Sequence, residues 1–585
     1  MANDQTIPEK VKGGAITCTV KINGQVIPQT FQLFCATVLK EINRIPSANL
    51  SIIDGEPSKG QFAASSSSSF VPGAEIEIYA GQQAHEDLIF RGVIIKHAIA
   101  IRKNGVSKLN LECKDKAFRM TLGRKSSYYN DVADSDIANT LLSKAGLTVN
   151  TVDDTKTKFP EMVQFDVSDW DFLATRMDIN GKLIAIDNGT ANITAPDFSQ
   201  NPVLKLLYGS TIHEFDAEMD ARNQYKAIKA VAWDCSSQEV LEVSGQEPTQ
   251  VKDNGNVTSG DLAYVGALDE MILRHGGKVS QEELQSWANA CWQRSRMAKI
   301  RGRVDFDGFA GIKPGDILEL SGLGDRFNGK VFVSAIRHSL SKGGWITSAQ
   351  FGLSPEWFAN QFNTAVGAQN TLIPTIQGLH TGVVAQLEKD PAGEDRVLVK
   401  LPMVNIGGNG TWARVSTLDA GKERGSFFRP DIGDEVLVGF INNDPRDAVI
   451  LGMLNSSKLP APIQPKDDNK EKGFFFASKM KIIFHEGDKS MTFETPGGNK
   501  LIISDRDEGI ALQDQNGNKI LMNSDGITLE SAKKMILKAS SGDIEIEGMN
   551  VKQKAQVEFK AEGTAGLEVS SSAIAKLKGS LVQIN

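Results

Sequence analysis

Apolar and polar residues alternate along the C-terminal part of the chain, between Met480 and Asn585. The apolar residues occur in pairs separated by one residue, and the positions around them are mostly Lys, Glu, Asp, Ser and Thr. A period of two is typical of β-strands, and turn-forming stretches such as Asn516-Gly517-Asn518 separate the pairs. Short strands are therefore predicted at Ile482/Phe484, Met491/Phe493, Leu501/Ile503, Ile510/Leu512, Ile520/Met522, Ile527/Leu529, Met535/Leu537, Ile544/Ile546, Val557/Phe559, Leu567/Val569 and Val582/Ile584.

Each of these strands has a narrow apolar face, which is too small to form a core within one chain. A single-chain β-solenoid would need a repeat of about 20 residues or more, and no such repeat is visible. Three copies around one axis would join the apolar faces and close the sheet edges. We therefore expect an intertwined trimeric β-helix, with a solenoid or a β-sandwich as alternatives. The residues expected on its axis are Phe484, Phe493, Ile503, Leu512, Met522, Leu529, Leu537, Ile546, Phe559 and Val569.

The alternation continues into the last four residues, Val582, Gln583, Ile584 and Asn585. In a trimer these ends would expose an apolar triangle and unpaired strand edges. Because such surfaces are usually covered, we expect the four residues to dock a partner at the tip. Fraying of the last residues is the alternative.

A motif occurs twice in the N-terminal part of the chain. It consists of Pro-Gly, a strand with a central Glu, Phe-x-Gly, and a basic residue followed by His. The repetition predicts two copies of one small β-barrel. Three chains would then place six similar barrels around one axis in a pseudo-sixfold ring. The copies run through Pro72-Gly73, Ile76-Glu77-Ile78, Phe90-Arg91-Gly92 and Lys96-His97, and through Pro314-Gly315, Leu318-Glu319-Leu320, Phe327-Asn328-Gly329 and Arg337-His338.

Helical patterns interrupt the strands. The longest predicted helix, Gln281 to Ile300, is amphipathic and has Trp287 and Trp292 on its apolar side. A stripe with this spacing is more often core than binding site, so we expect both Trp side chains to be buried. Further helices are expected at Val38 to Arg44, Ser135 to Gly146 and Ser168 to Gly181.

A third β unit is predicted from Ile376 to Met453, where strands and Gly-rich or Pro-Asp turns suggest a five-stranded OB-type barrel. The expected fold is mainly β, with two barrels that carry α/β insertions, the OB-type barrel and the trimeric β-helix. The expected boundaries are 1–130 for the first barrel, 131–220 for an α/β insertion, 221–372 for the second barrel with the long helix, 373–455 for the OB barrel, 456–473 for a linker and 474–585 for the β-helix.

Composition and motifs limit the classes of function that are possible. The 585 residues carry a net charge of −8, and no basic cluster indicates nucleic-acid binding. The five cysteines form no CxxC pair and suggest buried thiols in a reducing compartment. Met1 to Gln5 lack the features of a signal peptide, and no apolar run is long enough to span a membrane.

Catalytic and cofactor motifs were not found. HExxH, GxSxG and metal-spaced His/Cys clusters are missing, although counting carboxylates does not exclude a glycosidase-like pair. Gly407-Gly408-Asn409-Gly410 has no following Lys-Ser/Thr for a phosphate site and is read as a loop. We therefore expect no catalytic, cofactor or metal site.

A family resemblance rests on four stretches: Ser168-Asp169-Trp170-Asp171-Phe172-Leu173, Trp287-Ala288, Arg301-Gly302 and Lys313-Pro314-Gly315-Asp316. In combination they resemble the hub of VgrG-type spike proteins of contractile injection systems. The C-terminal strand array resembles the needle of these proteins. The resemblance covers nearly the whole chain.

The resemblance implies a homotrimer that adapts a hexameric inner tube to a threefold puncturing needle. Glu77 and Glu319 would then lie on the tube-facing edges of the two hub barrels, and a small PAAR-type tip protein would sit on Val582 to Asn585. Baseplate components and, transiently, a target membrane are the other expected partners. Assembly is expected in the bacterial cytoplasm, with delivery outside the cell.

Two other functions remain as alternatives. A trimeric fibre for receptor binding would carry a bulky C-terminal head, which the sequence lacks. A wall-degrading spike would need a lysozyme between OB barrel and needle, and Asn455 to Lys472 is too short for one. The sequence does not distinguish a phage tail, a type VI system and an extracellular particle, and it does not reveal whether the needle holds an ion.

Overall fold

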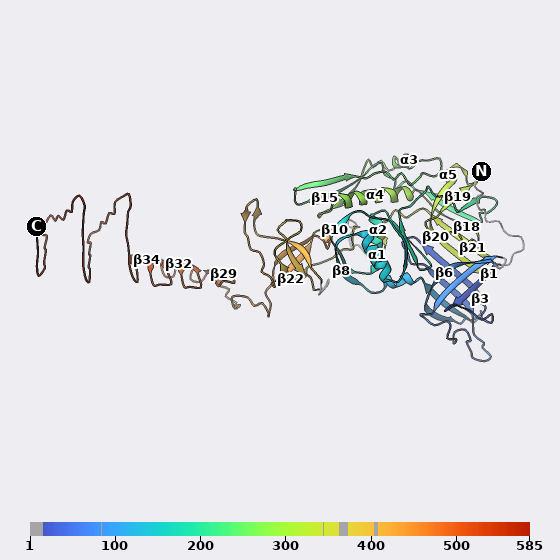
Figure 1. The fold of residues 1–585 in the computed structure, drawn as a ribbon, viewed down its shortest axis with the longest axis horizontal. Helices are drawn as coiled ribbons and strands as arrows, with labels where there is room; N and C mark the ends of the chain where they lie inside the picture. Colours follow the sequence, from blue (N-terminus) through green and yellow to red (C-terminus); the bar gives the residue numbers. More distant parts are fainter. Residues whose placement is uncertain are drawn as a thin grey trace. The chain divides into compact units, whose positions relative to one another are not determined.

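The computed structural model describes residues 16–82, 85–103, 105–342, 344–361, 372–402 and 408–584. The chain divides into two units, Met1–Leu459 and Pro460–Asn585, which are described separately (Figure 1). The expectations for Met1 to Gln5, for Gly407 and for Asn585 lie outside the described residues.

A 13-stranded sheet forms the N-terminal part of the first unit. The strands fall into two sets that correspond strand by strand, both in their succession along the chain and in their positions in the sheet. The sheet orders are β3-β4-β7-β6-β5-β1 and β14-β18-β21-β20-β19-β13. The bounds of the first set, including the short β2, are β1 Ile16–Ile22, β2 Gln25–Val26, β3 Leu33–Glu41, β4 Ser47–Ile53, β5 Glu75–Gln82, β6 His85–Ala100 and β7 Lys108–Lys114. Those of the second are β13 Leu204–Leu207, β14 Glu214–Met219, β18 Ile300–Asp307, β19 Ile317–Ser321, β20 Gly329–Ser341 and β21 Gly344–Phe351.

The Pro-Gly turns occupy equivalent places in the two sets. Gly73 has φ +98° and donates its N–H to the carbonyl of Ile94 at 2.8 Å, and Gly315 has φ +103° and donates to Val333 at the same distance. A side chain other than glycine is strained at such a φ. The two predicted copies are therefore built on the same turn and strand order.

The expected alignment of the later part of the motif is wrong by two residues. Ile78 pairs with Phe90 in the first set, and its equivalent Leu320 pairs with Gly329 in the second. Phe90 thus corresponds to Gly329 and not to Phe327, and a β-bulge at the same place in β6 and β20 keeps this offset. The cause is the connection, because a short helix, α5 (Gly324–Phe327), precedes β20.

The helix expected at Val38 to Arg44 is also wrong, because β3 extends to Glu41. Ala36 and Val38 are fully buried, and β3 pairs with β4 on one side and with β20 on the other. Sheet pairing on both sides outweighs the local helical propensity of this stretch. Strand β3 therefore joins the two copies into one sheet.

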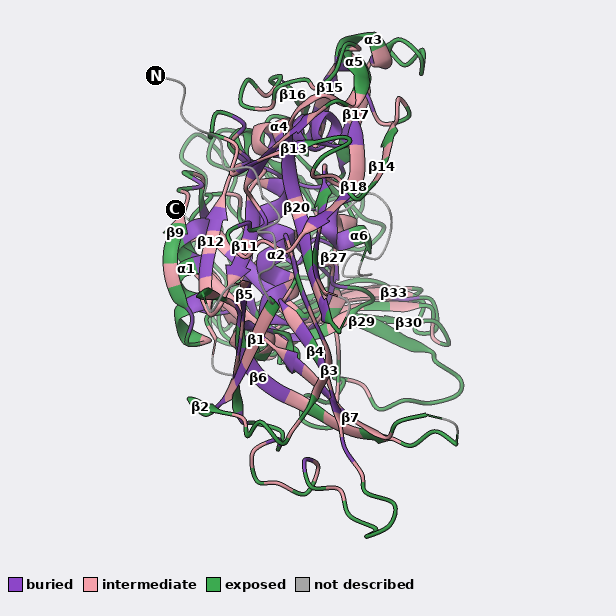
Figure 2. Cartoon of the chain, turned by 90° about the vertical axis from the view of Figure 1, so that its right-hand side faces the viewer, coloured by how far each residue is buried: buried purple, intermediate pink, exposed green. Residues whose placement is uncertain are grey.

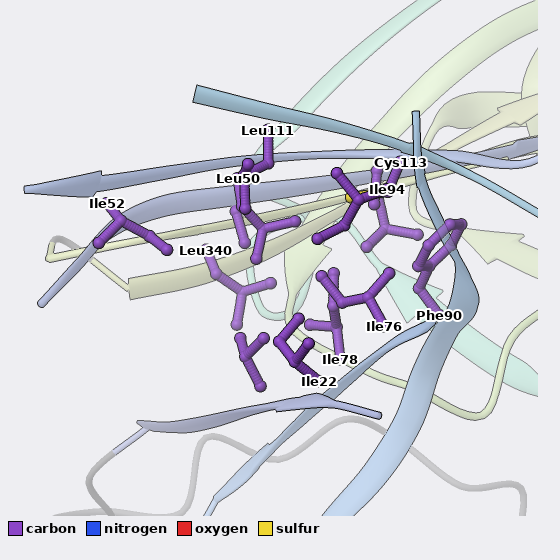
Figure 3. Close-up of a cluster of buried hydrophobic side chains, with 14 of the residues drawn as sticks. Ile22, Leu50, Ile52, Ile76, Ile78, Phe90, Ile94, Leu111, Cys113 and Leu340 are labelled. Carbon is purple, nitrogen blue, oxygen red and sulfur yellow. The ribbon is translucent and has the colours of Figure 1, made fainter. Parts of the chain in front are cut away.

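The core of the first copy lies between its strands (Figure 3). Ile22, Ile76 and Phe90 point toward Leu50 and Leu340, so that β20 of the second copy contributes to the core of the first. Figure 2 shows the buried segments concentrated along the central strands and helices.

The insertions carry the main helices. After the 3-10 helix η1, helix α1 lies beside α2, and α4 covers the sheet β16-β15-β17. Trp287 and Trp292 of α4 are buried, as expected. The bounds are η1 Lys116–Thr121, β8 Lys125–Ala133, α1 Asp134–Lys144, β9 Thr148–Val152, β10 Lys158–Val167, α2 Asp169–Ile179, β11 Leu183–Asp187, β12 Thr190–Thr194, β15 Ile228–Asp234, β16 Glu239–Ser244, α3 Ser259–Ala263, β17 Met271–His275, α4 Gln281–Met297 and α6 Phe358–Gln361.

The predicted OB-type barrel is present as a closed barrel of strand order β22-β23-β24-β28-β27. The short hairpin β25–β26 and the 3-10 helix η2 lie in its connections. The bounds are β22 His380–Gln386, β23 Val397–Lys400, β24 Thr411–Val415, β25 Ala420–Gly421, β26 Arg424–Gly425, β27 Glu435–Phe440, η2 Ile441–Asn443 and β28 Ala448–Met453.

The second unit is an antiparallel meander of seven strands, each paired with its neighbours in sequence. The bounds are β29 Glu471–Phe475, β30 Lys481–His485, β31 Ser490–Glu494, β32 Lys500–Ser504, β33 Gly509–Gln513, β34 Lys519–Asn523 and β35 Gly526–Glu530. The strands expected from Met535 onward do not form within the described single chain up to residue 584. Figure 1 draws this stretch as extended segments joined by reversals, so the backbone has no ladder partner there.

Within the described residues, no helix is both long and apolar enough to cross a membrane.

Candidate functional site

The strand register of the second unit aligns the predicted apolar pairs on one face of the sheet. The pairs form two rows that cross the sheet side by side from β30 to β35. The first row is Ile482, Phe493, Leu501, Leu512, Ile520 and Leu529, and the second is Phe484, Met491, Ile503, Ile510, Met522 and Ile527.

The first row lines a groove of about 780 Å³, which Met535 and Leu537 also border. Of the predicted axis residues, the groove brings together Phe493, Leu512, Leu529 and Leu537. Phe484, Ile503 and Met522 lie instead in the second row, while Ile546, Phe559 and Val569 are exposed in the stretch without strands. The predicted set therefore alternates between the two rows and does not follow a single line.

The opposite face of the same sheet is polar along one margin. Glu494 bridges Lys481 at 3.2 Å and Lys500 at 3.4 Å, and farther along Lys519 pairs with Glu530 at 2.7 Å. Opposite charges on neighbouring strands favour this register, and exposed pairs of this kind contribute about 0.2–1 kcal/mol each. One face of the sheet therefore carries the two apolar rows, whereas the opposite face combines this charged margin with a central row that includes Ile483, Ile502 and Leu521.

The apolar face is open to water in the single chain. Leu529 is 51% exposed, and Val557 of the strandless stretch is 99% exposed. At the predicted tip, Val582 and Ile584 are 49% and 89% exposed. Contiguous apolar surface of this extent is unusual for a soluble chain and marks a contact surface.

The two predicted tube-facing residues occupy equivalent positions on β5 and β19. Glu77 lies across from Arg91 and accepts a hydrogen bond from its Nε at 2.9 Å. Glu319 lies across from Lys330, and its Oε1 is 3.2 Å from the Nζ of Lys205. Both copies thus present a partly buried carboxylate among basic groups at the same point of the sheet.

A buried ionic cluster, which sequence reasoning missed, connects the insertions with the OB barrel. Arg176 of α2 donates to Asp134 of α1 at 2.9 and 2.8 Å and to Glu283 of α4 at 2.9 Å. Arg446, which follows η2, donates to the same Glu283 at 3.0 Å and to Asp444 at 2.8 Å. We call these five residues the junction cluster. Only Arg446 keeps appreciable exposure, at 11% of its side chain.

The oppositely charged groups of the junction cluster stabilise one another's charged forms. Burial would by itself raise the pKa of Glu283 and Asp444, but Arg446, together with Arg176 for Glu283 and His275 for Asp444, holds both pKa values below their usual range. Burial would lower the pKa of Arg176 and Arg446, and the facing carboxylates raise them instead. These four groups therefore remain charged in the interior, where an unpaired charge would be costly.

At a second acidic group of this junction, burial outweighs the neighbours that favour its charged form. Glu161 of β10 lies against β24 of the OB barrel, where burial raises its pKa to about 7 despite the backbone N–H of Trp412. Its Oε1 is buried and meets no hydrogen-bond donor among the described residues. Protonation of Glu161 would therefore relieve an unfavourable buried charge.

No group of three or more potential metal ligands occurs within the described parts of the chain.

Three family models match parts of this chain. Residues 12–342, more than half of the chain, match the family model described as the Alg8 N-terminal domain. The chain belongs to the Alg8 N-terminal domain family. Residues 380–454 of this Alg8-domain protein match the type VI secretion system/phage-baseplate injector OB domain, and 490–585 match the phage baseplate V C-terminal trimerisation domain. No curated protein matches the Alg8-domain chain.

Two solved structures share the fold at low identity. The Francisella PdpA–VgrG complex in its lidded form is 12% identical with a TM-score of 0.52, covering 88% of this chain and 80% of that one. A lidless PdpA–VgrG complex is 12% identical with a TM-score of 0.51, covering 88% and 98%. The c3393 protein of E. coli, described as a type VI secretion component similar to the T4 tail proteins gp27 and gp5, is 12% identical with a TM-score of 0.45, covering 74% and 99%.

The expected resemblance to VgrG-type spike proteins is thus confirmed. This Alg8-domain protein is a spike-like structural protein of the VgrG and phage-baseplate kind, with a C-terminal trimerisation domain.

The junction cluster gives a first prediction. Glu283→Gln leaves two buried guanidinium groups without their shared carboxylate and should destabilise the hub by about 3–5 kcal/mol. Glu282→Gln, on the exposed side of the same helix, should change little. Calorimetric unfolding of both variants measures the difference, and equal midpoints would contradict the role of the cluster.

The same carboxylates predict acid sensitivity. Because their folded pKa values are depressed, their stabilising contribution is present above the unfolded pKa, about 4, and is lost as the pH falls through the folded values. Below pH 4, the unfolding midpoint of the wild type should therefore decrease more steeply with falling pH than that of Glu283→Gln.

Glu161 predicts the opposite pH dependence of stability. Its folded pKa is raised to about 7, so the proton-dependent stabilisation is fully present below the unfolded pKa and is lost as the pH rises through 7. Glu161→Gln, which stays neutral, should raise the unfolding midpoint at pH 8 and leave it nearly unchanged at pH 4. The exposed Glu388→Gln serves as the control, and a midpoint gain that is the same at both pH values would refute the assignment.

Proposed function

We propose that this protein is the central homotrimeric spike of a contractile injection machine. The observation that carries the proposal is the two-row apolar face, open to water in one chain and located in a region that matches a trimerisation domain. Three copies would turn these faces toward a common axis and supply ladder partners to the extended stretch beyond Glu530. The opposite face, whose margin carries the charge pairs, would then lie outside, and the result would be a needle.

The two hub copies support the adaptor part of the proposal. Three chains with two topologically equivalent strand sets each would present six similar units to a hexameric inner tube. Glu77 and Glu319, which occupy equivalent positions, are proposed to face the tube. The junction cluster would hold the hub insertions on the OB barrel while force passes from the tube to the needle.

A tip protein of the PAAR type is proposed to sit on Val582, Gln583, Ile584 and Asn585. The exposed apolar side chains of Val582 and Ile584 support a docking role. Inner tube, baseplate components and a transiently contacted target membrane complete the proposed partners. Assembly in the bacterial cytoplasm and delivery outside the cell follow from the same reading.

A structural role is favoured over an enzymatic one. The description of the Alg8 N-terminal domain names a domain and no activity, and the matched spike and baseplate components are structural. The segment between the last OB strand and β29 runs from Leu454 to Lys470 and leaves no room for an inserted lysozyme domain. Hydrolysis of purified peptidoglycan by the isolated spike would reverse this preference.

The needle proposal predicts a face-dependent effect of charge. Leu529→Asp would place three carboxylates in the apolar interior at a cost of several kcal/mol each, so the trimer should dissociate or lose its resistance to detergent. Thr528→Asp, one residue away on the opposite face, should leave the trimer intact. Light scattering gives the mass of each variant, and a monomeric wild type would refute the proposal itself.

The ring proposal predicts equal effects at two distant positions. Glu77→Gln and Glu319→Gln should each reduce the amount of inner-tube protein that co-purifies with the spike, and to a similar degree, because the two carboxylates are equivalent. Light scattering should still report a trimer for both variants. Loss of tube protein in only one variant would show that the copies do not meet the tube alike.

A further inference from the structure

Strand β3 has a partner on both of its margins within its own chain, whereas its equivalent β14 has a described partner on one margin only. Within the described residues β14 pairs only with β18 and ends the sheet. Strand β3 pairs with β4 in the same way but also with the C-terminal half of β20. The edge of β14 that corresponds to the β3–β20 joint is therefore open.

Strand β6, the equivalent of β20, has the complementary opening. On β20, β19 pairs with residues 329 to 332, and β3 continues along the same margin from Ala335 to Ser341. On β6, β5 ends its pairing at Val93, and no described strand continues beyond it on that margin. Each chain thus forms one such joint internally, between β3 and β20. The equivalent edges of β14 and β6 are left unpaired within the described chain.

The side chains along the open edges of β6 and β14 are more exposed than their counterparts on β20 and β3. The equivalence set by the bulges makes Ile99 and Ile101 the counterparts of His338 and Leu340. His338 and Leu340 are 2% and 5% exposed beside β3, whereas Ile99 and Ile101 are 46% and 63% exposed. On the other strand, Ala36 and Val38 of β3 are fully buried, and their counterparts Phe215 and Ala217 of β14 are only partly buried.

We propose that β14 of one protomer pairs with β6 of the next, antiparallel and in the register of the β3–β20 joint. This inference deepens the proposed function and rests on the homotrimer. Transferring the β3–β20 register through the equivalences places Lys96 opposite Asp220, Ala98 opposite Glu218, Ile99 opposite Ala217 and Ile101 opposite Phe215. Ile101 then enters the second core of the neighbouring protomer, as Leu340 enters the first core of its own.

Charge agrees with the transferred register. The outward row of β14 and the residue after it is acidic at every second position, with Glu214, Asp216, Glu218 and Asp220. The facing row of β6 and its extension contains no acidic residue and ends in Lys96 and Arg102. Lys96 would meet Asp220, and Arg102 would meet Glu214, at the two ends of the joint. A second copy of this chain is therefore the occupant that fits both edges.

A disulfide tests the register directly. Ile42 donates its N–H to the carbonyl of Ser334 at 2.9 Å, which makes that pair hydrogen-bonded and the Leu39–Arg337 pair non-hydrogen-bonded. The counterpart of the latter pair is Ala98–Glu218, and the short separation of a non-hydrogen-bonded pair suits a disulfide. Ala98→Cys/Glu218→Cys should form interchain disulfides under mild oxidation and run as a covalent trimer on non-reducing gels.

The matched control is Ala98→Cys/Ala217→Cys, in which the second cysteine faces the other side of β14. It should cross-link at least about tenfold less, and each single variant should not form a covalent trimer. Amide exchange of the unmodified protein provides a second measurement that needs no variant. Residues 96–100 and 214–219 should be protected to the same degree as residues 35–41 of β3.

The outcomes separate this inference from the proposed function. Covalent trimers together with protected edges support the pairing. A wild-type trimer in light scattering whose β6 and β14 edges exchange rapidly, or whose Ala98→Cys/Glu218→Cys variant trimerises without cross-linking, overturns the pairing and leaves the spike proposal standing. A monomeric wild type overturns both.

Discussion

Unpaired strands are the constraint on which this molecule depends. A strand must satisfy its backbone N–H and C=O groups and cover its apolar side chains, and the hub and the second unit both leave this requirement partly unmet within one chain. The hub strands β6 and β14 have half-open margins, and the C-terminal meander exposes a whole apolar face. In the proposed homotrimer, further copies of the same chain would meet both deficits.

The junction cluster solves a different problem. Helices α1 and α2 come from one insertion, α4 comes from another, and the OB barrel follows the hub strands in the chain, so no continuous sheet ties them together. Two arginines and three carboxylates do so instead, and each ion is surrounded by opposite charge. Such a cluster contributes little net stability compared with apolar packing, but it requires one relative placement of its members, since any other would leave charges buried and unpaired.

Sequence reasoning succeeded where the information is local. The Pro-Gly turns with positive φ at Gly73 and Gly315, the OB-type barrel and the first strands of the second unit follow from turn chemistry and a period of two. It failed where distant contacts decide, as in β3, whose second partner lies about three hundred residues away in β20. It also failed at the Phe position of the repeat, where the helix α5 precedes β20. Apart from the near neighbours Asp444 and Arg446, the junction cluster joins residues between 42 and 163 positions apart, and no spacing rule finds it. The one available signal was Arg176, a charged residue among the apolar positions of α2.

The strand β20 belongs to both hub copies, because it pairs with β19 and β21 of its own set and with β3 of the other. A ring of six separate barrels would need six chains to meet and would have six identical joints. With two copies fused through β20, three chains suffice, and every second joint is already closed when the chain folds. The fused copies are also free to diverge, as β1 and β13 have done by pairing with their neighbours in opposite directions. In the proposed trimer, a ring that looks sixfold to one neighbour would thereby offer a threefold pattern of two alternating units to another.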